Sequence, residues 1–273
     1  MGDPPLVDVG TFDRVEGTGA ADDFVTWMAH QRRGGADAAV DALGLATGDR
    51  VLDLGCGPGV DLAALAARVG PTGLAVGLDR SPAMATAART TTASTASAGV
   101  LVGDGQALPF ASSAFAGAWA RAVLVHTPTP AAAVAELARV VRAGGPIVLS
   151  EPDHGSHVVA TDEIDVFERV RAHRRTTFRH PLVGRDLPAL AVGAGLEVVG
   201  RWLGPIEHRS LARARAAGGP FDVAVAAAVE AGAITADEGR RYLASLEERN
   251  AVGAFLFAAL AVTVVARRSS DQG

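Results

Sequence analysis

Acidic side chains close or follow three apolar stretches of the chain, and together they can bind a polar ligand. The run 51–54 contains Asp53 and leads into a glycine-rich turn, residues 74–78 lead into Asp79, and a third run is followed by Asp104. A carboxylate about 20 residues beyond a glycine turn can accept hydrogen bonds from both vicinal hydroxyls of a ribose. This spacing indicates a nucleoside-like ligand.

The same stretches indicate the elements that must place these side chains. Residues 51–54 are mostly apolar, as in a strand that is buried on both faces. Gly55, Gly57 and Gly59 then permit a sharp turn and a close approach of a ligand to the backbone. Residues 61–68 have helical spacing. Strand, glycine turn and helix form a nucleotide-binding crevice at the carboxyl edge of a parallel sheet.

Two later apolar runs, 116–120 and 146–150, also end in polar residues. The first is followed by Arg121 and His126, and the second by Glu151, Asp153, His154 and His157. Because parallel strands end at one edge of a sheet, both groups should face the crevice. We expect His126 to be the first candidate for a general base, with Glu151 and His154 as further candidates. Packing and a polar loop are the alternatives. The spacing of Asp153, His154 and His157 is not diagnostic of a metal, and no metal is predicted.

The stretch from about residue 50 to residue 152 resembles the class I S-adenosylmethionine-dependent methyltransferases that act on small molecules. The resemblance is carried by VLDLGCGPG at 51–59, GLDRS at 77–81, GDGQALPF at 103–110 and AELARVVRAGGPIVLSEPD at 135–153. A glycine turn alone would suit NAD equally well. The four segments in combination favour the methyltransferases.

The resemblance implies S-adenosylmethionine as the cofactor and S-adenosylhomocysteine as the product. Asp79 would bind the ribose, Asp104 the adenine amino group, and Asp53 the ammonium group directly or through water. The other implied cofactor contacts are Gly55, Cys56, Gly57, Gly59, Arg80, Gly105, Gln106 and Arg121. Each acid also has a local alternative, as a cap or a turn residue. Arg32 and Arg33 are open candidates for the cofactor carboxylate.

Methyl transfer to an acceptor is an in-line displacement at a carbon that positive sulfur already activates. The protein mainly aligns the two molecules and excludes water, which can contribute on the order of 7–11 kcal/mol. A general base is needed only where the acceptor must lose a proton.

The predicted fold is α/β: a Rossmann-like, seven-stranded, mostly parallel sheet with helices on both faces and helical lid insertions. The resemblance implies that the last strand is antiparallel. We expect one methyltransferase domain over 1–273. Its core would be about 34–156, 184–206 and 251–268, and its cover a helix at 20–33 and helical segments at 157–183 and 207–250. The last three strands are predicted at 146–150, 196–203 and 255–266.

Composition narrows the classes of function. The formal net charge is −5, and all 25 basic residues other than histidine are arginine. The sequence has no basic cluster with interleaved aromatic residues, so it does not favour a nucleic-acid substrate. The lack of lysine beside abundant alanine is typical of GC-rich bacterial genomes. Cys56 is the one cysteine, and the beginning of the sequence lacks the plan of a signal peptide. The longest apolar run is too short for a bilayer. We therefore expect a cytoplasmic protein without a membrane partner.

The resulting hypothesis is methylation of a small, fairly apolar molecule, with a natural-product intermediate as the implied acceptor. Oxygen is the favoured acceptor atom, while nitrogen, carbon and a homodimeric state stay open. One rival binds the same cofactor and catalyses cyclisation without methyl transfer. Further rivals are an NAD-dependent oxidoreductase and a non-catalytic partner protein.

Overall fold

A computed structural model describes residues 37–216 and 219–269 of the chain. The helix predicted at 20–33, with His30, Arg32 and Arg33, lies outside these residues. The first described element is helix α3, Asp37–Asp41.

The described strands form one sheet in the order β3-β2-β1-β4-β5-β7-β6. Strands β1 to β5 pair in parallel, whereas β7 runs antiparallel to both of its neighbours. The predicted fold class is therefore confirmed. The strands are β1 Arg50–Leu54, β2 Leu74–Asp79, β3 Ala98–Val102, β4 Gly117–Arg121, β5 Pro146–Val159, β6 Leu196–His208 and β7 Phe257–Arg268.

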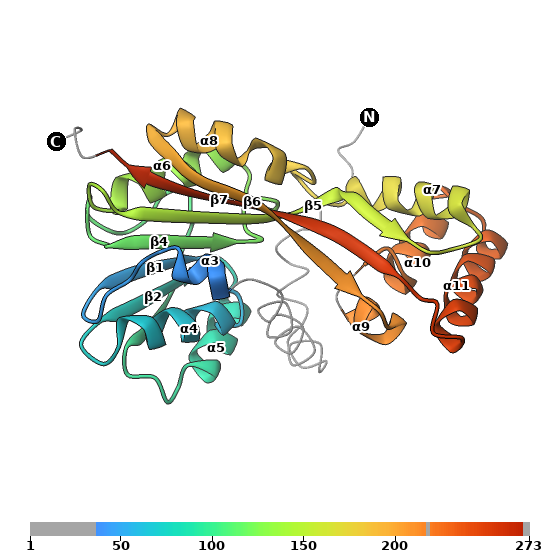
Figure 1. Cartoon of the computed structure of the whole chain (residues 1–273), viewed down its shortest axis with the longest axis horizontal. Helices are drawn as coiled ribbons and strands as arrows, with labels where there is room; N and C mark the ends of the chain where they lie inside the picture. Colours follow the sequence, from blue (N-terminus) through green and yellow to red (C-terminus); the bar gives the residue numbers. More distant parts are fainter. Residues whose placement is uncertain (1–36, 217–218, 270–273) are drawn as a thin grey trace.

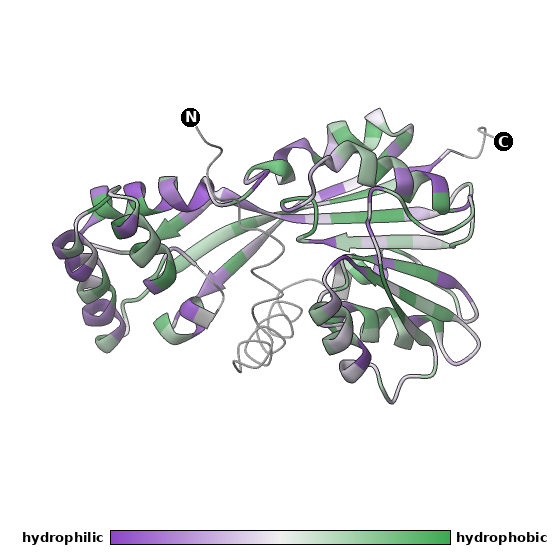
Figure 2. Cartoon of the chain, turned by 180° about the vertical axis from the view of Figure 1, so that it is seen from behind, coloured by the Kyte–Doolittle hydropathy of each residue, from purple (hydrophilic) through white to green (hydrophobic). Residues whose placement is uncertain are grey.

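Helices cover both faces of the sheet because both faces are apolar (Figure 1). Alternate strand residues, such as Leu52 and Leu78, pack against α6 and α8 on one face. Their neighbours, such as Val51 and Trp119, pack against α3, α4 and α5 on the other. Green, apolar segments run along the strands in Figure 2. These helices are α4 Val60–Val69, α5 Pro82–Thr91, α6 Pro130–Val140 and α8 Leu187–Gly193, the last preceded by the 3-10 turn η2 Val183–Asp186.

Strands β5 and β6 are longer than the sequence indicated. The fifth strand was expected to end at residue 150 and the sixth at 203, but they continue to Val159 and His208. Both continue because β7 pairs with them along its whole length, from Arg267 down to Phe257. The three strands therefore run beyond the rest of the sheet, along the long axis of the molecule in Figure 1.

A β-bulge interrupts β5 within this extension. From Asp153 to Val158 the strand advances five positions, while β7 advances two, from Leu260 to Ala258. Ser156 lies in the bulge, and its Oγ accepts a hydrogen bond from the Leu260 N–H at 2.8 Å. Bulges bend a strand and redirect its side chains, often beside active sites. This bulge carries His154 and His157.

Four helices pack against the strand extension and form a separate apolar cluster around Phe167, Phe221, Tyr242 and Phe257. We call them the helical extension; they are α7 Ile164–Arg175, α9 Leu211–Ala216, α10 Asp222–Glu230 and α11 Ala236–Ala251. The predicted N-terminus of the last helix is confirmed, because Thr235 and Glu238 form a capping box. The division into a core and a covering lid stays a prediction.

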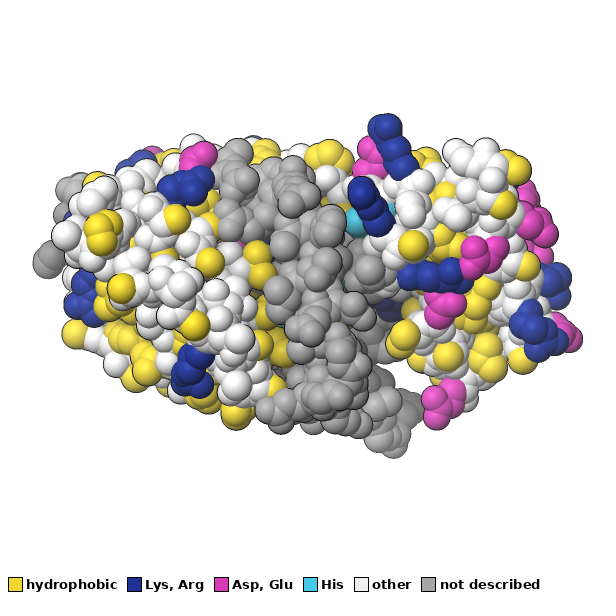
Figure 3. Space-filling view, turned by 90° about the horizontal axis from the view of Figure 1, so that it is seen from below, with side chains coloured by type: hydrophobic (Ala, Val, Ile, Leu, Met, Phe, Trp, Pro, Cys, Tyr) yellow, Lys and Arg dark blue, Asp and Glu magenta, His cyan; other side chains and the backbone are white. Residues whose placement is uncertain are grey.

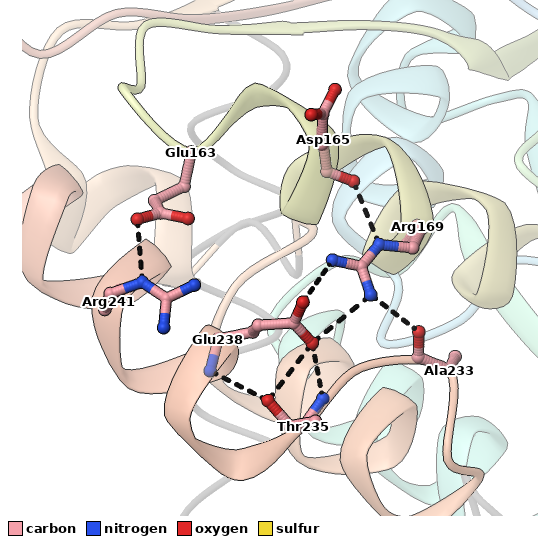
Figure 4. Close-up of polar contacts among 7 residues, drawn as sticks. All are labelled: Glu163, Asp165, Arg169, Ala233, Thr235, Glu238 and Arg241. Atoms are coloured by element: carbon pink, nitrogen blue, oxygen red, sulfur yellow. Dashed lines mark hydrogen bonds and ion pairs between the residues drawn. The ribbon is translucent and has the colours of Figure 1, made fainter.

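Ion pairs join α7 and its N-terminal residue to α11 within this extension (Figure 4). The guanidinium of Arg169 on α7 donates to both carboxylate oxygens of Glu238 on α11, at 2.6 and 3.2 Å. Nearby, the Nε–H of Arg241 donates to Glu163 at 3.0 Å. Seen from below, charged side chains gather on this half of the molecule (Figure 3). Among the described helices, none is both long enough and apolar enough to cross a membrane.

Candidate active site

A cavity of about 810 Å³ lies at the carboxyl ends of β1, β2 and β4 and continues along the strand extension. We call its two halves the donor end and the acceptor end. The donor end is lined by Gly55, Gly57, Asp79, Asp104 and Gly105. The acceptor end is lined by residues of β5, β6, β7 and the helical extension, among them four histidines.

The glycine turn after β1 has the backbone geometry that the sequence predicts. Gly55 and Gly57 both have positive φ, at 64° and 48°, and both line the cavity. A Cβ on Gly55 would lie 2.3 Å from Cγ2 of Val123, so a side chain there would displace the neighbouring loop. Gly59 has a different role. Its φ is 85°, a Cβ there would lie 2.9 Å from Cα of Ala88 in α5, and it does not line the cavity.

Asp79 and Asp104 lie at the same end of the cavity, as predicted. Asp79 accepts hydrogen bonds from the N–H groups of Gly57 at 2.8 Å and Ser81 at 2.9 Å. Its carboxylate is thereby held against the glycine turn, at the wall of the cavity. Asp104 is exposed and accepts from the N–H of Gln106 at 2.9 Å.

Arg80 and Gly105 also line the donor end, whereas Gln106 does not. The side-chain amide of Gln106 bonds Asp104, and its oxygen accepts from the Thr129 N–H at 2.9 Å. Gln106 therefore braces Asp104 where the sequence suggested a direct contact. A Cβ on Gly105 would lie 2.7 Å from Cδ1 of Leu54, so the backbone passes close to the floor of the site.

Asp53 and Cys56 are buried behind the glycine turn and do not line the cavity. Burial raises the pKa of Asp53 well above its usual range, and the nearby charge of Asp61 adds to this. Its Oδ2 has no hydrogen-bond partner among the described residues. Burial likewise raises the pKa of the Cys56 thiol, which leaves it uncharged and unsuited to nucleophilic attack. In this geometry neither side chain reaches the cavity directly.

Arg121 does line the cavity, and its direction is fixed from behind. Its Nε–H donates to Asp61 Oδ2 at 2.7 Å, and the indole N–H of Trp119 donates to the same oxygen at 3.2 Å. Both side chains of the Arg121–Asp61 pair are largely buried. Asp61 thus holds the guanidinium of Arg121 between the donor end and the loop that carries His126.

The donor end fits an adenosyl ligand. A braced carboxylate, Asp79, ends β2 at the position that suits ribose hydroxyls. Gly55, Gly57 and Gly105 line the cavity without side chains, and at Gly55 and Gly105 a Cβ would collide with Val123 or Leu54, so a ligand can lie against this backbone. Asp104 lies beyond Gly103 on the same wall and offers a carboxylate acceptor to an amino group.

His126 lines the cavity, as predicted. Burial, together with the charge of Arg174, lowers the pKa of His126 to about 4. The imidazole is therefore neutral at pH 7, the form that a general base requires, but so low a pKa makes it a weak base. Its place in the cavity lining keeps it the candidate for that role.

Glu151 is placed differently from the prediction. Its carboxylate is buried, absent from the cavity lining, and accepts hydrogen bonds from the N–H groups of Val123 at 2.8 Å, Leu124 at 2.7 Å and Val125 at 3.4 Å. Burial raises the pKa of Glu151 to about 7. It therefore positions the loop that leads to His126 and does not reach an acceptor, which corrects its predicted catalytic role.

His154 lines the cavity, but its bonding does not suit a base. Its Nδ1 lies 3.0 Å from Nη1 of Arg174. A guanidinium only donates, so Nδ1 must accept, and the ring proton is assigned to Nε2. Burial, aided by Arg174, lowers the pKa of His154 to about 2. The predicted proton acceptor is therefore a hydrogen-bond donor in this structure.

Several residues of the acceptor end were not among the sequence candidates. Arg174, Phe178, His173, His208 and Phe257 were not among the candidates, although all five line the cavity; His157, which the sequence placed with His154 at the crevice, lines it too. They come from β5, α7 and its following turn, β6 and β7. A clue lay in the basic residues at the end of α7. Within 37–216 and 219–269, no group of three or more histidine, cysteine or acidic residues is arranged to hold a metal.

The strand order and the site define the class of protein. The dinucleotide-binding fold has the order 3-2-1-4-5-6, whereas here an antiparallel β7 lies between β5 and β6. Residues 51–145 match a family model described as a methyltransferase domain. Over these residues the chain matches the kind of domain that its sequence resembles, and a solved methyltransferase complex contains a chain of the same fold.

Individual relatives extend this similarity over part of the chain. An uncharacterized 37.1 kDa protein in transposon TN4556 of Streptomyces fradiae is 38% identical over 160 residues, which are 58% of this chain and 46% of that protein. A demethylmenaquinone methyltransferase of Staphylococcus aureus is 34% identical over 109 residues, 40% of this chain and 45% of that enzyme. The matches thus span about half the length of these curated relatives.

The fold is shared over a longer stretch. A chain from the complex of the Haloferax volcanii Trm112 methyltransferase activator with a candidate methyltransferase has a TM-score of 0.59. The match is 22% identical in sequence and covers 94% of this chain and 97% of the other. At this identity the likeness concerns the fold alone.

Proposed function

We propose that this chain transfers a methyl group from S-adenosylmethionine to a small-molecule acceptor. The observation that carries the proposal is the composition of one continuous cavity. Its donor end has the glycine turn and two carboxylates, and its acceptor end has aromatic rings and histidines. Arg121 and His126 lie on the segment that lines the cavity between them.

The cofactor, when bound, supplies a methyl group on a positively charged sulfur. Asp79 would accept hydrogen bonds from the ribose hydroxyls, Asp104 would accept one from the adenine amino group, and the glycine backbone would line the rest of the adenosyl portion. Asp53 is too deeply buried for direct contact, so its effect on the ammonium group would pass through space or through water. Arg121 would border the amino-acid portion.

The acceptor atom is proposed to be oxygen. His126 is neutral at pH 7, as its lowered pKa requires, and is therefore in the form that takes the proton of a hydroxyl. Nitrogen and carbon acceptors need the same alignment and differ in the demand for a base. A natural-product intermediate, a cytoplasmic location and a homodimer stay predictions.

Calorimetry with S-adenosylhomocysteine tests the donor end directly. We expect saturable binding to the natural chain and about tenfold or greater weakening in Asp79→Asn, because charge-assisted hydrogen bonds to the ribose are weakened. Asp237→Asn, an exposed acid on α11, is the matched control and should bind as the natural chain does.

A second measurement distinguishes the rivals. Labelled S-adenosylmethionine is incubated with the chain and a panel of hydroxylated small molecules, and labelled product is counted. Binding without label transfer to any acceptor would favour a cyclase-like enzyme of the same fold. Binding of NADH with none of S-adenosylhomocysteine would contradict the proposal as a whole.

A further inference from the structure

Aromatic rings contact one another along the acceptor end of the cavity. The rings of His154 and Phe178 are stacked with centroids 3.9 Å apart, and His154 meets His157 edge-on at 5.7 Å. Phe257 lies 5.4 Å from His157 and is stacked with His208 at 6.0 Å. We call this set of cavity-lining rings the ring wall; its members are His154, His157, Phe178, His208, Phe221 and Phe257.

The backbone of the strand extension holds the ring wall in place. Phe257 of β7 pairs directly with His208 of β6, and two residues further along β7 Ala259 pairs with Ile206. All four residues line the cavity, so they lie on one face of the sheet. The bulge in β5 brings the other two histidines of the wall to that face. The wall is therefore a preformed surface of ring faces and edges, which suits a planar ring system.

His154 presents an N–H donor at this wall. Its Nδ1 lies 3.0 Å from Nη1 of Arg174, and because a guanidinium only donates, Nδ1 accepts and the ring proton is assigned to Nε2. Burial lowers the pKa of His154 to about 2, so the ring is neutral at pH 7 and carries that one proton. Among the described residues, none accepts a hydrogen bond from this Nε2–H. A ligand in the cavity can accept it.

Two further histidines of the wall have the same polarity. Nδ1 of His157 and Nε2 of His208 are buried and have no hydrogen-bond partner among the described residues. Burial lowers the pKa of both rings, to about 3 in His157, so each ring is neutral at pH 7 and has a single N–H. Buried N–H donors without a partner are rarer in proteins than buried acceptors without one, so the proton is assigned to the other nitrogen of each ring. Nε2 of His157 and Nδ1 of His208 are therefore donors as well.

A planar ligand on this wall consequently needs hydrogen-bond acceptors. A donor that loses water and gains no partner when a ligand binds weakens the complex. A carbonyl group attached to an aromatic ring meets the requirement, because its oxygen accepts hydrogen bonds near the plane of the ring. A ligand with donors alone would leave the three histidine N–H groups unpaired.

We propose that the methyl acceptor is a hydroxylated aromatic ketone, whose planar ring lies along the ring wall and whose carbonyl oxygen accepts a hydrogen bond from the Nε2–H of His154. The inference rests on the proposed function, because it names the substrate class of the same cavity. The hydroxyl oxygen forms the bond to the methyl carbon, its proton passes to His126, and the carbon–sulfur bond breaks to leave S-adenosylhomocysteine. His154 determines which acceptors bind and takes no part in proton transfer.

Two probes that differ only in the carbonyl test the donor. The full chain is saturated with S-adenosylhomocysteine and tested with 9-fluorenone and with fluorene, which share one planar skeleton and differ in a carbonyl in place of a methylene. Equilibrium dialysis with the protein in excess gives both dissociation constants, and their ratio defines the carbonyl preference. Because the two probes differ in hydration, this ratio is compared between the natural chain and its variants, where that difference cancels.

Variants then locate the preference. His154→Phe keeps a ring beside Phe178 and loses the donor, so it should lower the carbonyl preference about five- to a hundredfold, the range expected when a carbonyl is left unpaired. His180→Phe makes the same exchange outside the cavity lining and should retain the preference. An unchanged ratio in His154→Phe, or no binding of either probe to the natural chain, would overturn the inference.

Nitrogen NMR of the chain labelled with 15N-histidine tests the tautomers independently. At pH 7 we expect the ring proton on Nε2 in His154 and His157 and on Nδ1 in His208. Each signal is assigned by its loss in the corresponding histidine-to-phenylalanine variant. A proton on Nδ1 of His154 would contradict the donor assigned to this residue.

S-adenosylhomocysteine binding is measured for every variant. Its retention shows that the variant is folded and that the donor end is intact. Loss of that binding in the natural chain would contradict the proposed function itself, whereas retained binding with an unchanged ratio would contradict the aromatic-ketone inference alone.

Discussion

Replacing Glu151 by glutamine should change how the stability of the protein depends on pH. The Glu151 carboxyl is buried, and its pKa is raised from 4.5 to about 7. Between these values the folded state holds a proton that the unfolded state has released. The stabilisation from this group is therefore fully present below pH 4.5 and is lost as the pH rises through 7. At roughly 1.4 kcal/mol per pKa unit, the loss amounts to about 3 kcal/mol.

Urea unfolding of the natural chain and of Glu151→Gln, from about pH 4 to pH 8, measures this loss. Glutamine does not titrate, so the stability of the natural chain relative to the variant should fall by about 3 kcal/mol across the range. The buried histidines, whose lowered pKa values act in the opposite direction, cancel in that difference. Glu230→Gln, on the exposed side of α10, is the control and should show no such change. A difference that is independent of pH would refute the raised pKa of Glu151.

Three further substitutions test other parts of the structure. His126→Gln should lower the rate of O-methylation in single-turnover assays by roughly 10²–10⁴-fold, while the affinity for S-adenosylhomocysteine stays unchanged. An unchanged rate would show that His126 only packs in the cavity and is not the base. Gly59→Ala should lower the free energy of unfolding by at least about 2 kcal/mol, since φ is 85° and the Cβ meets the backbone of Ala88. Gly232→Ala is the control, because its φ is 69° but open space surrounds the added Cβ. In the same urea titration it should lower the free energy of unfolding by less. Thr235→Ala should remove about 1 kcal/mol by breaking the capping box of α11, and Thr235→Ser should not; equal unfolding midpoints for both variants would argue against the cap.

The donor end was predictable because its parts are local in sequence. A buried strand, a glycine turn and a helix follow one another within 20 residues, and Asp79 and Asp104 each lie at or just beyond the end of a strand. Parallel pairing then brings such positions to one edge. The sequence shows these strand ends directly, because each apolar run stops at polar or glycine residues. Gly55 and Gly57 then take the positive φ that glycine permits.

The limits of prediction appear where contacts are distant in sequence. Glu151 follows a strand and resembles a cavity residue, but its partners are backbone N–H groups 26 to 28 residues earlier. His154 looks like a base until Arg174, 20 residues later, fixes its tautomer. Gln106 adjoins a cofactor residue, yet its oxygen bonds Thr129. Side-chain type and spacing do not specify which of several nearby partners a polar group meets.

The acceptor end of the cavity forms only because three strands are longer than the rest of the sheet. This explains why the residues of the acceptor end were harder to predict from the sequence than those of the donor end. Had β5, β6 and β7 ended where the rest of the sheet ends, His157, His208 and Phe257 would have no common face. Because β7 pairs with both neighbours as far as Phe257, one pleated surface continues out of the sheet and under the helical extension. The bulge in β5 then turns two histidines toward this surface. Substitutions at the acceptor end can consequently change acceptor choice while the donor end, built from other strands, keeps its geometry.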